Sequence, residues 1–374
     1  MLYALAATGA GRHTEHEEWL RKRAFAPKPG TGLGFYDGLH GIAYAFDALG
    51  RRGDALELVG LCLKEKWERL GQSLYAGLSG IGLNLLHLGR ATGERDLTKA
   101  AAEVTDMVAG RLGDVDSVPE VSGGGNPHAG LMRGSAGPAL LFVRMYEETG
   151  DEALLDLAHT ALRQDLKRCT RREDGQLQVQ QGWRTNPYLD EGSAGIGLVL
   201  ALYLAHREDE TFRESLAAIA QVATLDYYVQ PGLFAGRGGM IAALCAGLQP
   251  GLDRAAPEIA GQITRLAWHA MPYGGGLAFP GNQLLRLSMD LGSGTAGVLL
   301  ALGAALHDRP VHLPFLTPRT PSRRSGRGGG PAERLKEVKY MALLDLQDME
   351  VAGGGHGGGS NLSLLGCTPT RTAA

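Results

Sequence analysis

The sequence predicts an all-α protein, an α/α toroid in which an inner ring of helices is wrapped by an outer ring. The first observation behind this prediction is a Gly-x-x-Gly signature that recurs six times and each time opens an apolar run. The second is that amphipathic segments alternate with these runs. The third is that 56 of the 374 residues are glycine, about twice the usual share. Together they predict six to seven helical hairpins.

The inner helices are expected directly after the signatures. These begin at Gly38, Gly77, Gly134, Gly192, Gly236 and Gly294, with spacings of 39, 57, 58, 44 and 58 residues that suffice for a hairpin and a loop. The runs that follow, such as IGLNLLHLG and IGLVLALYLA, are apolar nearly all round, which is typical of buried helices.

The outer helices are expected in the amphipathic segments, whose polar faces suit solvent. These segments are residues 54–70, 96–112, 151–169, 212–228 and 258–271. No window alternates with period two for long enough to predict a strand. An open solenoid would show more regular spacing and one exposed concave face, so we favour the closed toroid.

The glycine pairs have a physical role in such a ring. Where inner helices crowd at one end, residues without a Cβ let the backbones approach. The same geometry directs several helix N-termini, with their free N–H groups, toward one mouth that favours an anionic group. The alternative is that the glycines serve packing alone.

Composition narrows the class of protein. A net charge of −3, a pI near 6.4 and 21 % charged residues give no basic excess for nucleic acid. Four scattered cysteines exclude a disulfide scaffold. Without a signal peptide or an 18-residue apolar stretch, we expect a soluble cytoplasmic protein with no membrane partner.

The chain divides into four parts. Residues 1–30 are expected to be a linker or entry segment and residues 31–316 the toroid. Residues 317–340 are rich in Pro, Gly and Arg and predict a flexible linker. Residues 341–374 form a separate C-terminal peptide.

Several motifs in order resemble the lanthionine synthetase C-like cyclase family, and most closely the cyclase domain of class III lanthipeptide synthetases. They are GFYDGLHG, GLMRGSAGPALLFVRMYEETGD, PYLDEGSAGIGLVLALYL and FPGNQLLRLSMDLGSGTAGVLLALGAALHD. The resemblance covers about residues 31–316 and implies a toroid, usually of seven hairpins. One hairpin is therefore degenerate or lacks its signature.

The C-terminal peptide resembles a class III precursor. LLDLQ, residues 343–347, is similar to the leader motif that such synthetases recognise, so a leader over about 341–356 and a core over 357–374 are expected. The expected recognition residues, on a short helix in an apolar groove, are Leu343, Leu344, Leu346, Gln347 and Met349. The core carries Ser360, Ser363 and Cys367 in the spacing of labionin or lanthionine rings.

The resemblance implies addition of a cysteine thiol to a dehydroalanine made from serine. Cys367 would attack the dehydrated Ser363, and in a labionin the enolate would attack the dehydrated Ser360. No kinase glycine loop, HRD or DFG motif is present. Kinase and phospho-Ser lyase activities are therefore expected in other domains or proteins.

Zinc-dependent relatives activate the thiol with two cysteines and a histidine. The corresponding positions here are Asp190, Phe234 and Ala235, which do not form such a set. We therefore expect no metal and no other cofactor. Two acid/base positions of the family also depart, because Ser73 replaces an aspartate and Arg133 a histidine.

The candidate residues are chosen by position around the mouth. The catalytic candidates are His128 and His40 as bases, Arg133 and Arg184 for an enolate or carbonyl, and Asp37 and Asp290 to orient a base or cap inner helices. The residues expected to bind the peptide are Arg237, Arg286 and Tyr36.

Two other functions are weighed against a cyclase. The toroid is a docking platform for the precursor if ring closure occurs spontaneously, and the missing metal ligands favour that alternative. A glycosidase needs paired carboxylates across a cleft, and the glycine signatures carry almost none.

Overall fold

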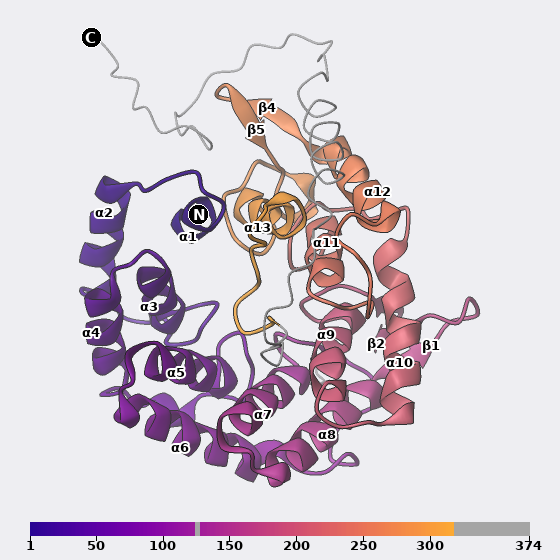
Figure 1. The fold of residues 1–374 in the computed structure, drawn as a ribbon, viewed down its shortest axis with the longest axis horizontal. Helices are drawn as coiled ribbons and strands as arrows, with labels where there is room; N and C mark the ends of the chain where they lie inside the picture. The colour runs from indigo at the N-terminus through magenta and orange to yellow at the C-terminus, as the bar shows by residue number, and fades with distance from the viewer. Residues whose placement is uncertain (124–127, 318–374) are drawn as a thin grey trace, which may run out of the picture.

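The inner helices form a closed ring. The computed structural model describes residues 1–123 and 128–317. Each inner helix contacts the next, in the order α1 (Leu2–Ala7), α3 (Leu39–Ala48), α5 (Leu78–Thr92), α7 (Ala136–Thr149), α9 (Ser193–Leu204), α11 (Arg237–Cys245) and α13 (Thr295–Leu306). Because α13 contacts α1, the ring closes (Figure 1). The toroid prediction is confirmed.

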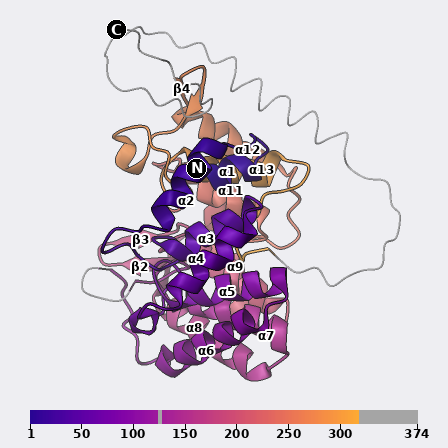
Figure 2. The same ribbon diagram turned by 90° about the vertical axis from the view of Figure 1, so that its left-hand side faces the viewer.

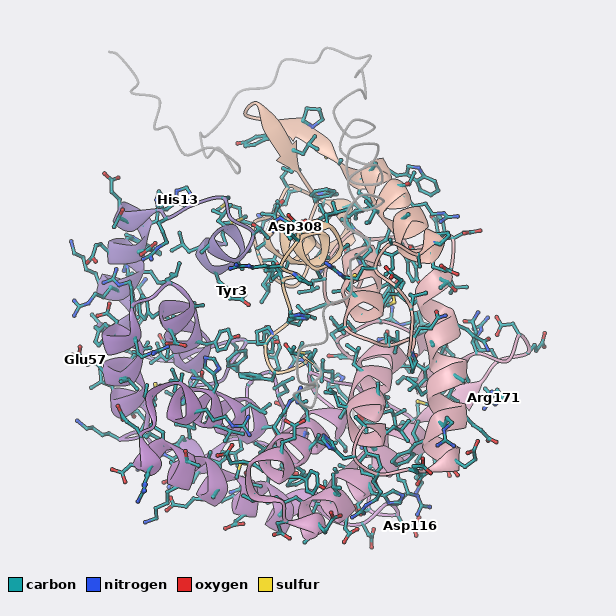
Figure 3. All side chains as sticks on the ribbon, viewed as in Figure 1. Tyr3, His13, Glu57, Asp116, Arg171 and Asp308 are labelled. Carbon is teal, nitrogen blue, oxygen red and sulfur yellow. The ribbon has the colours of Figure 1, made fainter. Side chains whose placement is uncertain are left out.

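The outer helices of the described residues are α2 (Thr14–Ala24), α4 (Arg52–Cys62), α6 (Arg95–Leu112), α8 (Glu152–Lys167), α10 (Glu210–Ala220) and α12 (Pro257–Leu266). From α4 onward each packs against the inner helix before it as a hairpin partner, whereas Arg21 of α2 pairs with Asp54 of α4. In Figure 3 the labelled Glu57, Asp116 and Arg171 lie on the outer rim, whereas Tyr3 points into the ring. A large apolar core fills the space between the two rings.

The helix pair without a glycine signature lies at the N-terminus. Residues 1–30, expected to be an entry segment, contain α1 and α2, and α1 takes a place in the inner ring. Ala4 of α1 packs with Ala296 and Leu300 of α13 and with Val311 in a small apolar cluster of its own.

Five short strands within residues 1–123 and 128–317 correct the expectation of a structure without strands. β1 (Cys169–Arg171), β2 (Leu177–Gln181) and β3 (Arg184–Asn186) form an antiparallel sheet, and β4 (Met271–Tyr273) pairs with β5 (Gly276–Ala278). Figure 2 shows β2 and β3 at one edge of the ring. Each strand has only three to five residues, too few for a period-two pattern to show.

A segment after α13, residues 307–317, runs into the ring, and we call it the strap. Its Phe315 packs on Phe35 at a ring-centroid distance of 4.8 Å and on Tyr44 at 5.5 Å. Arg144 of α7 donates hydrogen bonds to the carbonyl oxygens of Phe315 and Thr317. The strap therefore lies inside the ring, where it packs against α3 and is hydrogen-bonded to α7.

No helix in residues 1–123 and 128–317 is long and apolar enough to cross a membrane.

Candidate active site at the collar

The loops before the inner helices are linked by backbone hydrogen bonds. Six residues, each five positions before the second glycine of a signature, form what we call the collar. Along it the N–H of one residue donates to the carbonyl of the next, at 2.8 to 3.2 Å. In order, the collar residues are Tyr36, Tyr75, Met132, Asp190, Phe234 and Gly292. The repeat thus places six loops side by side at one end of the ring.

The second glycine of each signature allows this close arrangement. A Cβ on Gly195 would lie within 3.0 Å of the Leu189 carbonyl oxygen and of the Leu131 Cβ of the preceding repeat. Gly80 and Gly239 stand in the same relation to their own loops. This close contact is expected both if the glycines serve packing alone and if they also position a mouth.

The side chains of a histidine, an arginine and a glutamate meet beside the collar. His128 Nδ1 lies 3.3 Å from Glu191 Oε2, and Arg133 Nε lies 3.0 Å from Glu191 Oε1. The Arg133 guanidinium also lies over the Tyr75 ring, 4.4 Å from its centroid. His128 and Arg133 remain about two-fifths exposed, so both can reach a bound peptide.

Asp190 lies next to this group and is largely desolvated. Its Oδ1 atom is buried and has no hydrogen-bond partner among the described residues. Burial raises the pKa of the Asp190 carboxyl above its ordinary value. The hydrogen bond from the Glu191 backbone N–H lowers it in part, the Glu191 charge raises it, and the Arg133 charge lowers it. Asp190 is therefore suited to carry a proton.

The loop that carries Arg133 is held in place by a buried side chain of α8. Asp165 of α8 is fully buried and accepts hydrogen bonds from the N–H groups of Gly130 and Ala136, at 3.1 and 2.8 Å. Arg168 holds the same carboxylate at 2.9 Å. These bonds set the position of Arg133 between them.

An apolar chamber of about 320 Å³ lies below the collar, inside the ring. Tyr36 stacks on Tyr75 with ring centroids 6.1 Å apart, and Phe234 meets Tyr36 edge-on at 5.5 Å. Tyr36 and Phe234 line the chamber together with the strap residues Leu313 and Pro314. Tyr36 is thus placed where the candidate role in peptide binding requires.

Some predicted residues lie near the charged group. Asp37 is close enough that the Arg133 charge lowers the pKa of its carboxyl, although burial raises that pKa more strongly. Arg184 is exposed on β3 and donates to Gln181 at 3.0 Å, and Gln181 in turn reaches Glu191 at 3.4 Å. Arg184 is therefore one side chain removed from the site.

Two predicted residues are corrected by their burial. His40 is 1 % exposed and its Nδ1 lies 3.2 Å from Asn84 Nδ2, between α3 and α5, so it cannot reach a substrate thiol. Arg237 is fully buried; it donates to Gln262 and to the Asp226 carbonyl between α11 and α12. Its guanidinium therefore links α11 to α12 and does not face the mouth.

The last two candidates lie on the loop before α13. Asp290 accepts from the Ser293 N–H at 2.6 Å and from the Ser288 and Ser293 hydroxyls, so it shapes its own loop. The N-caps of α3 and α13 are Gly38 and Gly294, without a side-chain cap from either aspartate. Arg286 is exposed on this loop.

The positions that hold zinc in relatives do not fit a metal here. Asp190 is the one donor among them, since Phe234 packs against Tyr36 and Ala235 has no donor side chain. Within the part of the chain that the structure describes, no three His, Cys, Asp or Glu side chains are grouped as metal ligands.

Sequence reasoning overlooked Glu191. It pairs with both His128 and Arg133, and its signal is its place directly before Gly192. The tail residues proposed for modification and leader recognition, within 341–374, lie outside the described residues.

Two protein-family models match separate parts of the chain. The sequence model for lanthionine synthetase C-like proteins matches residues 68–172. That for the lanthionine-containing peptide SapB precursor matches residues 341–370. The chain therefore carries a lanthionine synthetase C-like region followed by a precursor-like region.

A probable SapB synthase from Streptomyces coelicolor is 47 % identical over 336 residues, which cover 89 % of this chain. The chain spans about a third of that relative's length, 35 %. Two structures of an α-1,6-mannanase from Salegentibacter sp. HEL1_6, one an inactive variant with bound mannotriose, are each 15 % identical. Their TM-scores are 0.47 and 0.46, with 78 and 77 % of this chain and 98 and 97 % of theirs covered.

Proposed function

We propose that the toroid is a lanthipeptide cyclase, which adds a cysteine thiol to a dehydroalanine in a precursor peptide without a metal. The observation that carries this proposal is the group of His128, Glu191 and Arg133 at the collar, directly beside an apolar chamber. The precursor-like region at 341–370 supports a substrate of this class, acting in cis or in trans.

The reaction needs a thiolate and a stabilised enolate. The Cys367 thiol loses its proton to a base, and Sγ forms a bond to Cβ of the dehydroalanine at position 363. The electron pair of the C=C bond moves toward Cα and its carbonyl, which gives an enolate. A proton delivered to Cα completes a lanthionine. In a labionin, Cα of residue 363 instead forms a bond to Cβ of the dehydroalanine at position 360, and the second enolate so formed takes a proton at its own Cα.

His128 is placed to take the thiol proton. Glu191 Oε2 lies 3.3 Å from the buried Nδ1, which makes no hydrogen bond with the described residues, so Nε2 is the nitrogen proposed to meet the substrate thiol. A histidine that lies against a carboxylate is a common general base.

Arg133 and Asp190 supply the complementary functions. The Arg133 guanidinium, held by Glu191 and Tyr75, offers positive charge and N–H donors to the enolate oxygen. Asp190, with its raised pKa, is the candidate donor of the proton to Cα. The Asp37 carboxyl lies close enough to Arg133 to affect the electrostatic potential at its guanidinium.

The steps that make dehydroalanine from serine are proposed to need other catalysts. Dehydroalanine must be made by phosphorylation of serine and elimination of phosphate, so a kinase and a phospho-Ser lyase are the expected partners, in the cytoplasm. The leader residues Leu343, Leu344, Leu346, Gln347 and Met349 are proposed to dock the peptide as a short helix.

The test offers the full chain a synthetic peptide of residues 341–374 with dehydroalanine at positions 360 and 363. Ring closure leaves the mass unchanged, so it is followed by loss of the free thiol to an alkylating reagent and by fragmentation. We expect closure faster than in buffer, with one diastereomer. Equal rates and mixed diastereomers would favour the docking platform, the alternative that the non-ligating Phe234 and Ala235 support.

A further inference from the structure

The side chains that line the apolar chamber are uncharged. Its walls come from five of the six collar loops, from α1, α2, α3 and α13, and from the strap, and none of its lining residues is Asp, Glu, Lys, Arg or His. Met1 also lines it, and burial lowers the pKa of its amino group. Among these residues are Ile42, Ala45, Leu189, Leu233, Leu291 and Leu313. A volume of about 320 Å³ is at the small end for ligand pockets. It therefore suits one or two side chains and excludes a whole peptide.

The chamber also presents neutral hydroxyl groups. Tyr3, Tyr36 and Tyr44 all line it, and Tyr3 forms a side-chain hydrogen bond with Tyr44. Burial raises the pKa of all three phenols, so they stay protonated and can donate to peptide carbonyl groups. Such a lining favours an uncharged, apolar segment with its backbone nearby.

The tail offers one segment of that kind. Residues 360–367, SNLSLLGC, contain three leucines and no charge. In contrast, the leader segment carries Asp345, Asp348 and Glu350, and burial of three carboxylates among these apolar side chains would be costly. From Thr317, the last described residue, 42 residues lead to Ser360, ample length to reach the collar.

We infer that the chamber binds the leucine side chains inside the forming ring, Leu364 and Leu365, and so selects precursors with large aliphatic residues between the reacting serine and cysteine. This inference rests on the proposed function. Leucines anchored below the collar would hold positions 363 and 367 together beside His128 and Arg133. Such anchoring turns binding energy into the proximity that ring closure needs.

The first test changes the peptide and leaves the full chain unaltered. Peptides of residues 341–374 with dehydroalanine at 360 and 363 carry Leu364→Ala, Leu365→Ala or both. We expect kcat/KM for ring closure to fall about tenfold or more for the double change, because a buried apolar side chain is worth at least that factor. Thr370→Ala, beyond the ring, is the matched control and is expected to change nothing.

The second test fills the chamber. Ala45→Phe projects a ring into it, whereas Ala217→Phe makes the same change on the exposed face of α10. We expect Ala45→Phe to lower kcat/KM for the Leu peptide about tenfold and to bring the Leu-to-Ala preference close to one. Ala217→Phe is expected to keep both values. Circular dichroism and the melting temperature establish that both variants fold.

The outcomes separate the two proposals. If the wild-type chain closes no ring faster than buffer does, the cyclase function fails. If it closes the Leu and Ala peptides equally fast with one diastereomer, the cyclase function stands and the chamber inference is overturned. That comparison uses the unmodified protein, so it decides the question even if Ala45→Phe does not fold.

Discussion

Among single residues, Glu191 links the candidate site together. One oxygen faces His128 and the other faces Arg133, so the carboxylate fixes a base and a cation at once. His128 and Arg133 were predictable because they lie in the loop just before a glycine signature. Glu191 stands before Gly192 as Arg133 stands before Gly134, but that position alone does not indicate which residues a carboxylate pairs with.

Removal of the base or its partner should slow ring closure. We expect His128→Gln to lower the rate about 100-fold, in the range for general base catalysis. Glu191→Gln should lower it too, and the lost activity should recover partly at higher pH as more thiolate forms in solution. The measurement is the thiol-alkylation assay across pH.

Glu214→Gln serves as the control for these variants. Glu214 is exposed on α10, far along the chain from the collar loops, and its loss should leave the rate and the pH profile unchanged. If His128→Gln and Glu191→Gln also keep the wild-type profile, the proposed roles are wrong.

His40 makes the stability of the fold depend on pH. Burial lowers its pKa from 6.5 to about 4, so between these values the unfolded chain binds more protons than the folded one. The stabilising effect is present above pH 6.5 and is lost as the pH falls toward 4. The difference corresponds to roughly 3 kcal/mol of unfolding free energy across that window.

We therefore expect His40→Gln to flatten the pH dependence of urea unfolding between pH 4 and 6.5. The exposed His16 is the comparison, and His16→Gln should keep the wild-type slope. An unchanged slope in His40→Gln would show that other groups govern acid unfolding.

At the scale of elements, the glycine signature predicts where each inner helix begins. The first glycine is the N-cap of α3, α5, α9, α11 and α13, and α7 starts one residue later, after Ser135. The outer helices agree less well, because α4 ends at Cys62 although the amphipathic pattern continues to residue 70. A position where two backbones touch requires glycine, so the sequence marks it. The residue at which an outer helix ends depends on competing local interactions, which the amphipathic pattern does not record.

The second glycine of the signature should not tolerate a Cβ. In Gly195→Ala the new methyl group meets the Leu189 carbonyl oxygen, which belongs to backbone and cannot turn away. We expect a loss of about 2 kcal/mol of unfolding free energy, although alanine has the better helix propensity. Urea unfolding at neutral pH measures it.

Gly60→Ala is the matched control within α4. No heavy atom lies within 4 Å of a Cβ built there, so the better propensity of alanine should stabilise by up to about 1 kcal/mol. If both variants shift stability in the same direction, the repeated glycines are not set by close approach.

For the whole molecule, the closed double ring was predictable and its interior was not. Alternation of apolar and amphipathic segments requires two layers, whatever their exact ends. The strap and α1 lack a repeated pattern, since each occurs once and takes its position from the ring around it. The apolar chamber is lined by residues of both α1 and the strap, so its shape could not be predicted from the glycine signatures.

Arg144 should hold the strap in place. Its guanidinium bonds the Phe315 and Thr317 carbonyls and pairs with Glu147, and Phe315 itself has a left-handed backbone, with φ of 66°. We expect Arg144→Met to cost about 2 to 4 kcal/mol and to expose Phe315 to chymotrypsin.

Limited proteolysis and urea unfolding check this expectation. Arg213→Met, which removes an exposed partner of Glu210, should stay within about 0.5 kcal/mol of the wild type and resist cleavage. If Arg144→Met resists chymotrypsin equally well, the strap is held by its apolar contacts alone.

The contact between α1 and α13 also has a consequence for how the protein folds. It joins residues 2–7 to residues 295–306, so it has a far greater sequence separation than contacts between successive hairpins. Local hairpins form sooner than such distant pairings, because less chain must be ordered first. During synthesis the growing chain would therefore pass through an arc of stacked hairpins with an unprotected apolar edge at each end, until the final inner helix leaves the ribosome and the two edges meet.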